Sequence, residues 1–409
     1  MVVAAFVAPY LLETTTRFIA AAAQLPGVRL AVITCEPAER LPPVLKQHLQ
    51  GHWQVDDALD PGGIAEAVKG LSRQMGPVER VVAALEQLQV PVAQVREELG
   101  IEGMDVATAL NVRNKARMKS VLHDAGIPCA RYRLVHHPDE ALAFAAETGF
   151  PLVAKPPAGA GSQATFRLDD AEALRSWLST APPTEDQPAL LEEFLTGEEH
   201  SFDAVTVHGH TGWWSISDYQ PGPLEVLRNP WIQWVVLMPR DISTPRYQEI
   251  GRVGPAALHA LGVRDALCHL EWFGRPDGSV AVSEVAARPP GGGISAMIGY
   301  AYDMNVYSMW GELMFLGGFQ PRERKYATGT AYLRGQGRGR VAGLSGVEEV
   351  QRQIGHLVVE ARLPRPGQPA SGEYSGEGTI IVRHPDTEVV QDALNRIITG
   401  IRVQMVETL

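Results

Sequence analysis

The first 85 residues alternate between continuous apolar runs and segments with helical spacing. Val2 to Ala8 and Leu30 to Thr34 are apolar throughout, which is typical of buried parallel strands. Thr14 to Gln24 and Ile64 to Met75 have the spacing of helices, and Arg80 to Leu85 predicts a further strand. This order predicts a doubly wound α/β unit. No Gly-x-Gly-x-x-Gly follows the first run, so the pattern does not indicate a dinucleotide site.

Between residues 111 and 325 the pattern changes to short strands separated by helices and turns. A basic helix from Asn114 ends at Gly126 and Pro128. Further strands are predicted within 133–135, 151–155, 189–195, 198–207, 268–273 and 280–287, and further helices within 138–148, 169–179, 248–261 and 302–315. Four of the eight tryptophans lie between 208 and 240, and we interpret these aromatic side chains as packing and lid material rather than a binding platform.

From Lys325 onward, strands and helices alternate again. Strands are predicted within 328–333, 357–361 and 378–383, and helices within 347–354 and 386–398. This alternation predicts a small α/β unit packed on the main one. The arginines and glycines of 334–340 are candidates for a phosphate contact, and a solvated hairpin tip is the alternative that we favour.

Two carboxylates, Glu271 and Glu284, stand thirteen residues apart and symmetric about the Pro-Asp-Gly turn at 276–278. Side chains alternate along a strand, so carboxylates in two paired strands point to one face when their registers match. Carboxylates that share a face repel unless a proton or a cation lies between them, and Mg²⁺ suits oxygen ligands. Because Mg²⁺ commonly shares its ligands with substrate phosphates, the pair also predicts a nucleotide nearby. The alternative is a surface hairpin with solvated carboxylates.

Arg288 and two lysines are candidate ligands for anions. Arg288 follows the second of these strands beside a Pro-Pro-Gly-Gly-Gly run, where a guanidinium can hold a phosphoryl or carboxylate group through two hydrogen bonds. Lys115 lies in the first turn of the basic helix, and Lys155 ends a strand before a loop of small residues that polyphosphate can approach. Glu86, at the carboxyl end of a strand, is a candidate substrate contact. A solvated surface position is the alternative for each.

Composition narrows the classes of partner. With 409 residues, the chain is too long for one hydrophobic core, and about three domains are expected. A net charge of -11 without a run of Lys or Arg argues against nucleic acid or an anionic membrane as a partner. Three widely spaced cysteines in no zinc or redox pattern predict a reduced, cytoplasmic setting. The apolar start lacks a basic region and is interrupted by Pro9, so we expect a first core strand there rather than a signal peptide. No apolar run reaches membrane-spanning length.

Four signals occur in one order along the chain and together resemble the ATP-grasp superfamily of carboxylate-amine ligases: Lys115, then Lys155 with its glycine loop, then the segment 192–199, then Glu271, Glu284 and Arg288. The tail looks like the small carboxy-terminal domain of the L-amino acid ligase branch. The resemblance implies an α/β (α+β) ATP-grasp fold. It places a Rossmann-like pre-grasp domain at 1–112, the ATP-grasp domain at 113–322 with a mobile lid at about 125–192, and a small α/β domain at 323–409.

The resemblance also implies the ligands and the residues that hold them. The cofactors are ATP and Mg²⁺ or Mn²⁺, and the partners are a small-molecule carboxylate and an amine. Glu271 and Glu284 are the implied metal ligands, and Lys155 and Arg288 the implied catalytic residues. The implied ATP contacts are Lys115, Lys155, Gly159, Gly161, Ser162, Gln163, Glu192, Glu193, Phe194, Leu195 and Glu199. The implied substrate contacts are Glu86, Arg288, Gly291 and Gly292.

The implied reaction forms an acyl phosphate from a carboxylate and ATP, and an amine then displaces phosphate. Two features depart from the family pattern. Ala286 stands where Asn is common, which leaves the number of metal ions open, and 231–238 holds no His, which leaves the amine-side chemistry open. Two alternatives remain: an ATP-grasp reaction on bicarbonate or formate, and a nucleotide-binding module without turnover. We expect a homodimer.

Overall fold

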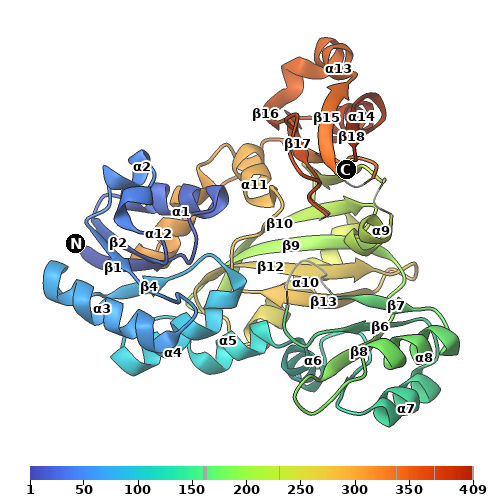
Figure 1. The fold of residues 1–409 in the computed structure, drawn as a ribbon, viewed down its shortest axis with the longest axis horizontal. Coiled ribbons are helices and arrows are strands. Elements are labelled where there is room, and N and C mark those ends of the chain that lie inside the picture. Colours follow the sequence, from blue (N-terminus) through green and yellow to red (C-terminus); the bar gives the residue numbers. More distant parts are fainter. Residues whose placement is uncertain (160–163, 230, 338, 373, 408–409) are drawn as a thin grey trace.

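The computed structural model describes residues 1–159, 164–229, 231–337, 339–372 and 374–407. Four sheets organise these residues: a parallel amino-terminal sheet, a large central sheet, a four-stranded sheet that we call the lid sheet, and a two-stranded pair near the carboxyl end. In Figure 1 the amino-terminal sheet lies to one side of the central sheet, and the lid sheet and the last helices lie at its two ends.

The amino-terminal sheet has the order β3-β2-β1-β4 and is parallel throughout. Its strands are β1 (Val2–Val7), β2 (Val28–Thr34), β3 (Gly51–Gln54) and β4 (Arg80–Val82). Phe6 points to the face that packs on Phe18 and Trp310, whereas Val3 points to the opposite face. Because both faces are buried, the strands are continuous apolar runs rather than alternating ones.

Helices cover both faces of this sheet. On one side lie α1 (Glu13–Ala23) and α12 (Val306–Leu316), which contact each other although they are far apart in sequence. On the other side lie α3 (Pro61–Met75) and α4 (Gln89–Leu99). The predicted doubly wound unit is therefore present, and a helix from the far end of the chain completes it.

The central sheet has the order β13-β12-β9-β10-β11-β14-β17-β16, and its neighbouring strands are antiparallel. The strands are β9 (Glu198–Val207), β10 (His210–Gln220), β11 (Trp234–Met238), β12 (Ala266–Gly274), β13 (Val280–Ala286), β14 (Ala327–Leu333), β16 (Val358–Arg362) and β17 (Gly378–His384). The sheet runs across residue 323, and the division of the chain into three domains remains a proposal.

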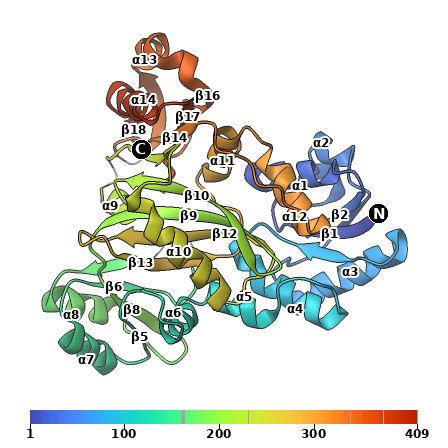
Figure 2. The same ribbon diagram turned by 180° about the vertical axis from the view of Figure 1, so that it is seen from behind.

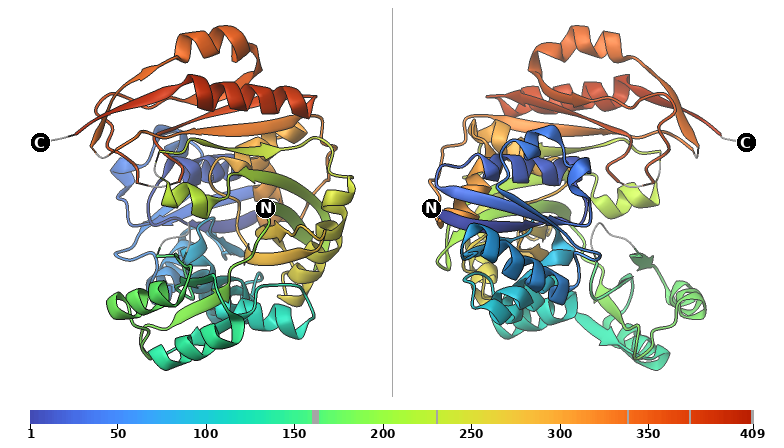
Figure 3. Two further views of the ribbon diagram at one scale, coloured as in Figure 1. Left: turned by 90° about the vertical axis from the view of Figure 1, so that its right-hand side faces the viewer. Right: turned by 60° about the vertical axis from the view of Figure 1, so that its left-hand side comes forward.

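The lid sheet has the order β5-β8-β6-β7. Its strands are β5 (Tyr132–Val135), β6 (Leu152–Lys155), β7 (Phe166–Leu168) and β8 (Ala189–Glu193). Helices α7 (Pro138–Thr148) and α8 (Ala171–Thr180) pack on it through a core of their own that includes Phe144 and Trp177. Figure 3 shows this unit at the end of the molecule opposite the last helices.

Helices also cover the central sheet. In Figure 2, α10 (Pro245–Ala260) lies across its strands, and α6 (Lys115–Asp124) contributes to the same core. The short helix α5 (Val106–Arg113) precedes α6. At the carboxyl end, α13 (Val347–Ile354) and α14 (Thr387–Gly400) pack with β14, β17 and the pair formed by β15 (Arg340–Ser345) and β18 (Arg402–Val406). The helices described here are too short or too polar to span a bilayer.

Three sequence-based predictions of elements were incomplete. The helix predicted at 302–315 is two helices, α11 (Ile294–Tyr302) and α12, separated by Asp303 in a left-handed conformation and capped by Asn305. The aromatic segment 208–240 forms β10 and β11 in the middle of the central sheet, with the short helix α9 (Pro223–Arg228) between them. The short edge strands β3, β7, β15 and β18 were missed, because such strands carry little hydrophobic pattern.

Candidate active site

The two predicted metal ligands lie on neighbouring strands and face each other. Glu271 on β12 is the register partner of Glu284 on β13, and the ladder shifts by one position directly after Glu271. The hairpin turn is held by Asp277, whose carboxylate accepts hydrogen bonds from the backbone N–H of Ser279 (2.9 Å) and from its hydroxyl (2.6 Å). The register thus places both carboxylates on one face of the sheet, as the spacing predicts.

A cavity opens over this face, with about 1390 Å³ of empty space, including the part that is open to solvent. The predicted site residues that line it are Glu86, Lys115, Lys155, Gly159, Glu192, Glu193, Phe194, Leu195, Glu199, Glu271, Glu284, Arg288, Gly291 and Gly292. Gly161, Ser162 and Gln163, the other predicted ATP contacts, lie outside the described residues. The fold therefore brings together side chains from the lid sheet, the central sheet and the amino-terminal unit.

Lys155 lies at the end of β6 and forms a buried ion pair. Its Nζ is 2.9 Å from Oε2 of Glu192, whose Oε1 is 3.7 Å from Nζ of Lys119. Burial lowers the pKa of Lys155, but the charges of Glu192 and Glu284 outweigh it and raise the pKa. Burial raises the pKa of Glu192, and the two lysines reverse that shift. The pair therefore stays ionised and presents an ammonium group to the cavity.

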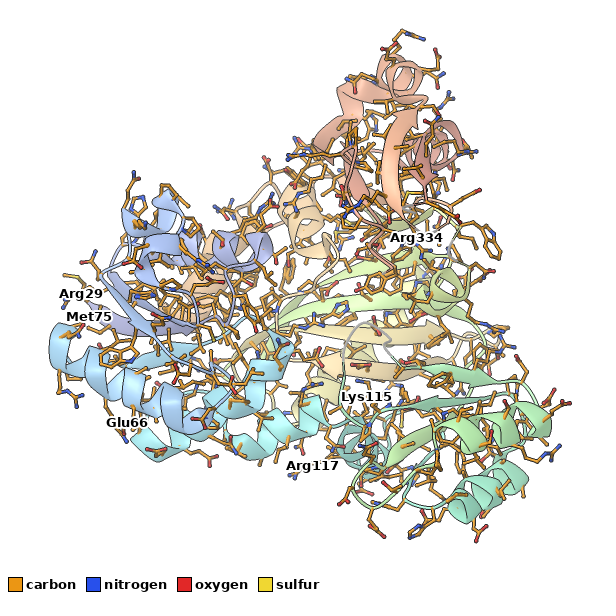
Figure 4. The ribbon with its side chains drawn as sticks, in the orientation of Figure 1. Arg29, Glu66, Met75, Lys115, Arg117 and Arg334 are labelled. Atoms are coloured by element: carbon orange, nitrogen blue, oxygen red, sulfur yellow. The ribbon has the colours of Figure 1, made fainter. Side chains whose placement is uncertain are left out.

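Lys115 begins α6 and reaches from that helix to the metal-ligand hairpin. Figure 4 shows it between the central sheet and the lid sheet. Its Nζ is 2.9 Å from Oε1 of Glu284 and donates to the carbonyl of Gly159 (2.9 Å), which also accepts a hydrogen bond from Arg113 (3.1 Å). Its backbone N–H donates to the carbonyl of Pro157 (2.7 Å). Lys115 thus links the start of the small-residue loop to the carboxylate pair.

Arg288 and Glu86 contact each other at the side of the cavity next to the amino-terminal unit. Oε2 of Glu86 is 3.0 Å from Nη2 of Arg288, and its Oε1 is 3.0 Å from Nη1 of Arg113. Arg288 also donates to the carbonyl of Pro289 (3.1 Å). Both oxygens of Glu86 are engaged and the residue is 7% exposed. Glu86 is therefore suited to orient Arg288, which differs from the direct substrate contact that its position in the sequence suggested.

The residues proposed for the adenosine end lie on β8, in the segment that follows it and on β9. Oε2 of Glu193 is 2.8 Å from Nε of Arg131, and the ring of Phe194 lies 4.2 Å from the guanidinium carbon of Arg167. Burial and the charges of Glu271 and Glu284 raise the pKa of Glu199. A hydroxyl group that donates to Glu199 would relieve this cost of burial. Glu199 therefore has the chemistry expected of a residue that binds a sugar hydroxyl.

Arg334, a candidate for a phosphate contact, donates its hydrogen bonds to backbone carbonyls of the protein instead. Arg334, labelled in Figure 4, is buried, and its Nη1 donates to the carbonyls of Val226 (2.8 Å), Asn229 (3.3 Å) and Ile232 (3.3 Å). These carbonyls lie in the last turn of α9 and just beyond it, where a cation compensates the unpaired acceptors. Arg334 therefore stabilises α9, and Arg338 of the same loop lies outside the described residues.

Solved structures share this architecture over the whole chain. The L-amino acid ligase of Bacillus licheniformis superposes with a TM-score of 0.76, covering 100% of this chain and 99% of the other at 19% identity. The chain has the ATP-grasp fold. The N5-carboxyaminoimidazole ribonucleotide synthetase of Thermotoga maritima has the same ATP-grasp architecture, with a TM-score of 0.71 and 18% identity over 99% of this chain and 100% of that one.

Sequence comparison also finds an L-amino acid ligase. The L-arginine-specific L-amino acid ligase of Bacillus subtilis is 29% identical over 272 residues, which are 63% of this chain and 64% of that protein. The chain thus spans less than two thirds of the length of this relative. No protein-family model matches the chain. A further ATP-grasp structure, the biotin carboxylase domain of the Hydrogenobacter thermophilus 2-oxoglutarate carboxylase, is in complex with MgADP and bicarbonate (TM-score 0.68, 18% identity, 98% of this chain and 90% of that one).

The donor set of this ATP-grasp chain fits a hard divalent cation that shares its ligands with phosphate. Glu271 and Glu284 supply carboxylate oxygens from one face of the hairpin. Within the described ranges there is no cluster of three His, Cys, Asp or Glu side chains that could enclose a metal ion. Mg²⁺ characteristically binds through one or two carboxylates and takes its other ligands from water and substrate phosphates. Two carboxylates are thus sufficient for Mg²⁺ bound together with a nucleotide.

His269 also lines the cavity, and the sequence reasoning overlooked it. Its Nδ1 is 2.6 Å from Oδ1 of Asp203, and its Nε2 is 3.6 Å from Oε1 of Glu271. Asp203 in turn accepts a hydrogen bond from the hydroxyl of Ser201 (2.8 Å). Burial lowers the pKa of His269, but Asp203 and Glu271 outweigh it and raise the pKa to about 9. The period of two along β12 could have revealed His269, because it precedes Glu271 by two residues.

Proposed function

We propose that the protein is an ADP-forming ligase that joins a carboxylate to an amine through an acyl phosphate, with an amino acid as a substrate. One observation carries this proposal: the ammonium of Lys155, the opposed carboxylates Glu271 and Glu284, and the guanidinium of Arg288 line a single cavity. Such a set can bind a triphosphate with its metal at one end and an anionic acid at the other. The resemblance to L-amino acid ligases supports the same reaction.

Each step of the proposed reaction uses groups on the cavity wall. A carboxylate oxygen of the substrate attacks the γ-phosphorus of ATP, the bond to the β-phosphate oxygen breaks, and ADP leaves. Lys115 and Lys155 neutralise the phosphate oxygens and hold them in line, which is most of what phosphoryl transfer requires. The cation supplies further charge neutralisation at the phosphates when it is bound. Glu192, Glu193, Phe194 and Leu195 hold adenine, and Glu199 holds the ribose.

The second step forms the amide bond. The amine attacks the carbonyl carbon of the acyl phosphate, the bond from that carbon to the phosphate-bearing oxygen breaks, and inorganic phosphate leaves. Arg288, held by Glu86, stabilises the negative charge on the departing phosphate and on the carbonyl oxygen. Gly291 and Gly292, which follow it, allow the substrate to approach the backbone closely.

A second candidate function is an ATP-grasp reaction on bicarbonate or formate. Structures of a purine-pathway synthetase and of a biotin carboxylase domain with bicarbonate share the fold and support this alternative. A nucleotide-binding module without turnover is the third reading, and Ala286 at the end of the metal hairpin is its main support. The acid that stimulates ADP formation distinguishes the first two, and Mg²⁺-dependent ADP formation distinguishes both from the third.

The experiment that tests the proposal is ADP release with Mg-ATP, screened over single amino acids and pairs, with the products identified by mass spectrometry. We expect release that depends on an amino acid and a product with the mass of an amide. Release that bicarbonate or formate stimulates instead would favour the second candidate. ATP binding without ADP formation under any of these conditions would favour the third.

Five further expectations belong to the same proposal. Mn²⁺ is expected to replace Mg²⁺, because both prefer oxygen ligands. We also propose a homodimer, a cytoplasmic location and no nucleic acid partner, in keeping with the net charge of -11 and the unpatterned cysteines. The domain limits proposed are 1–112, 113–322 and 323–409.

A further inference from the structure

We propose that the acid substrate of this ligase carries an apolar or aromatic side chain, which packs against an aromatic wall made of Tyr219, Trp234, Tyr332 and Tyr374. This inference rests on the proposed function and adds the substrate class to it. All four residues line the same cavity as Arg288 and the carboxylate pair. They come from β10, β11, β14 and the segment before β17.

The aromatic wall is one packed cluster. The rings of Trp234 and Tyr332 stack with centroids 4.4 Å apart and planes at 14°. Tyr219 and Tyr374 meet Trp234 edge to face, with centroids 6.1 Å and 5.9 Å away. The indole N–H of Trp234 donates to the carbonyl of Tyr374 (2.7 Å), so its one polar atom is satisfied. Val236 and Ile294 extend the same apolar side of the cavity.

The wall begins where the loop after Arg288 ends. The hydroxyl of Tyr332 donates to the carbonyl of Gly292, and a Cβ added to Gly292 would lie 3.4 Å from that hydroxyl oxygen. Gly292 and Gly293 both have positive φ, so this loop approaches the wall in a conformation that favours glycine. A substrate whose carboxylate lies beside Arg288 therefore directs the rest of its structure along the glycine loop toward Tyr332 and Trp234.

Charge distribution excludes a cationic side chain at the wall. Among the described acidic residues that line the cavity, ion pairs engage Glu86, Glu192, Glu193 and Glu284, and Glu271 lies beside His269. Glu199 is the residue that we assign to the ribose. A guanidinium or ammonium group placed against the wall would lose its water without gaining a counter-ion, which is costly.

Ring orientation leads to the same conclusion. Aromatic rings attract cations through their faces, whereas their edges carry positive partial charge. Trp234 and Tyr332 each cover one face of the other, and they are only 2% and 1% exposed. The wall is therefore a surface for dispersion and apolar contact rather than for cation binding. This chain is expected to differ here from its arginine-specific relative.

The first test ranks acid substrates with the wild-type protein. Amino acids that represent aromatic, branched apolar, cationic, acidic and polar side chains are compared by kcat/KM for ADP release with Mg-ATP. We expect the aromatic and apolar group to lead. A ranking led by arginine, lysine or aspartate overturns the inference and leaves the ligase proposal intact. If no amino acid stimulates ADP release but bicarbonate does, the proposed function fails, and the inference fails with it.

The second test uses two matched tryptophan variants. Trp234→Phe replaces the two-ring indole of the wall by a smaller phenyl ring. Trp213→Phe makes the same change at a buried tryptophan of β10 that packs on Tyr302 and Phe319 and does not line the cavity. One methylene group in an apolar pocket changes the discrimination between two substrates by about 10-fold or more. Trp234→Phe should therefore shift the preference toward larger side chains by roughly 10-fold. Trp213→Phe should leave the ranking unchanged.

An unchanged ranking in a folded Trp234→Phe variant, or an equal shift in both variants, contradicts the role of the wall. If Trp234→Phe does not fold, the ranking of the wild-type protein still decides the class of side chain.

Discussion

Each of the two hairpin carboxylates in the cavity has a cation or a hydrogen-bond donor beside it. Glu284 lies 2.9 Å from Lys115, and Glu271 lies 3.6 Å from His269. Burial alone raises the pKa of Glu271, but the hydrogen bond and charge of His269, with Arg288 and Lys115, reverse the shift and lower it. Glu271 is therefore ionised, and it faces Glu284 across the site proposed for a divalent cation bound together with a nucleotide.

The variant Glu284→Gln tests this arrangement with the smallest change in shape. It removes one negative charge from the pair and weakens both the contact with Lys115 and the predicted metal site. Since a single preorganised charged group is commonly worth about 10² to 10³ in rate, kcat for ADP release should fall by roughly that factor. Melting temperatures and steady-state kinetics are the measurements.

Glu198→Gln is the matched control for that variant, because Glu198 is an exposed carboxylate on the adjacent part of the sheet that pairs with Arg246 outside the cavity. Its kcat should stay within about twofold of wild type, in line with the small effect of most surface substitutions. Near-normal turnover in Glu284→Gln would show that the hairpin carboxylates do not serve the reaction.

Some of the site residues could be predicted from the sequence, and others could not. The spacing of Glu271 and Glu284 predicts that they face each other, because a short turn fixes the register of a hairpin. The pairing of Glu86 with Arg288, 202 residues away, could not be predicted, since no local pattern reports which loops of two different sheets meet. His269 was overlooked although a local rule would have found it.

Among the elements, α6 is the helix that presents Lys115. The side chain of Asn114 caps it by accepting a hydrogen bond from the N–H of Arg117 (3.0 Å). Asn114→Ala should lower the free energy of unfolding by about 1 kcal/mol, as for other lost caps. Because the first turn then frays, Lys115 is held less firmly, and the KM for ATP should rise. Chemical denaturation and ATP titration measure the two effects.

Asp60→Ala provides the control for the cap. Asp60 caps α3, in the amino-terminal unit, through the N–H groups of Gly62 (3.2 Å) and Gly63 (2.8 Å). Asp60→Ala should lower the free energy of unfolding by a similar amount, about 1 kcal/mol, without changing the KM for ATP. An equal rise of KM in both variants would mean that stability in general, and not the position of Lys115, governs ATP binding.

Elements with strong periodicity, such as α3 and α14, were predictable, whereas the role of β11 was not. Val235 to Met238 is an apolar run that fits a buried strand or a packed lid equally well, and only its pairing with β10 and β14 places Trp234 beside the cavity. Strand order in a sheet depends on contacts between distant segments, which a single sequence does not display.

At the scale of the whole molecule, an ion-pair cluster joins helix α1 of the amino-terminal unit to strand β16 of the central sheet. Nη2 of Arg17 on α1 is 3.1 Å from Oε1 of Glu360 on β16, and Tyr300 donates to the other oxygen of Glu360 (3.1 Å). Burial raises the pKa of Glu360, but the hydrogen bonds and charge of Arg17, with Tyr300, outweigh it and lower the pKa below its ordinary value.

This shift predicts a dependence of stability on pH. A lowered pKa in the folded state contributes stability that is present above the pKa of the unfolded chain, about 4.3, and is lost as the pH falls through the lower, folded value. At pH 7 Glu360→Gln should therefore unfold more easily than wild type, and the difference should shrink toward pH 3. Glu348→Gln, at an exposed position of α13, should show no such trend. A constant difference across this range would contradict the linkage.

The architecture as a whole was partly predictable. The order of motifs along the chain indicated the ATP-grasp fold, because each motif lies in its own local element. The way α12 closes the amino-terminal sheet and the way β14 extends the central sheet were not predictable, because both depend on packing between segments that are far apart in sequence.

The most direct test of the proposed reaction follows oxygen atoms. The amino acid substrate is labelled with ¹⁸O in its carboxylate, and the inorganic phosphate released during turnover with Mg-ATP is analysed by mass spectrometry. If the carboxylate attacks the γ-phosphorus and the amine later breaks the bond to carbon, each phosphate carries one ¹⁸O from the acid. Phosphate without label, released while an amide forms, would contradict the acyl phosphate and with it the proposed use of Lys155, Glu271, Glu284 and Arg288.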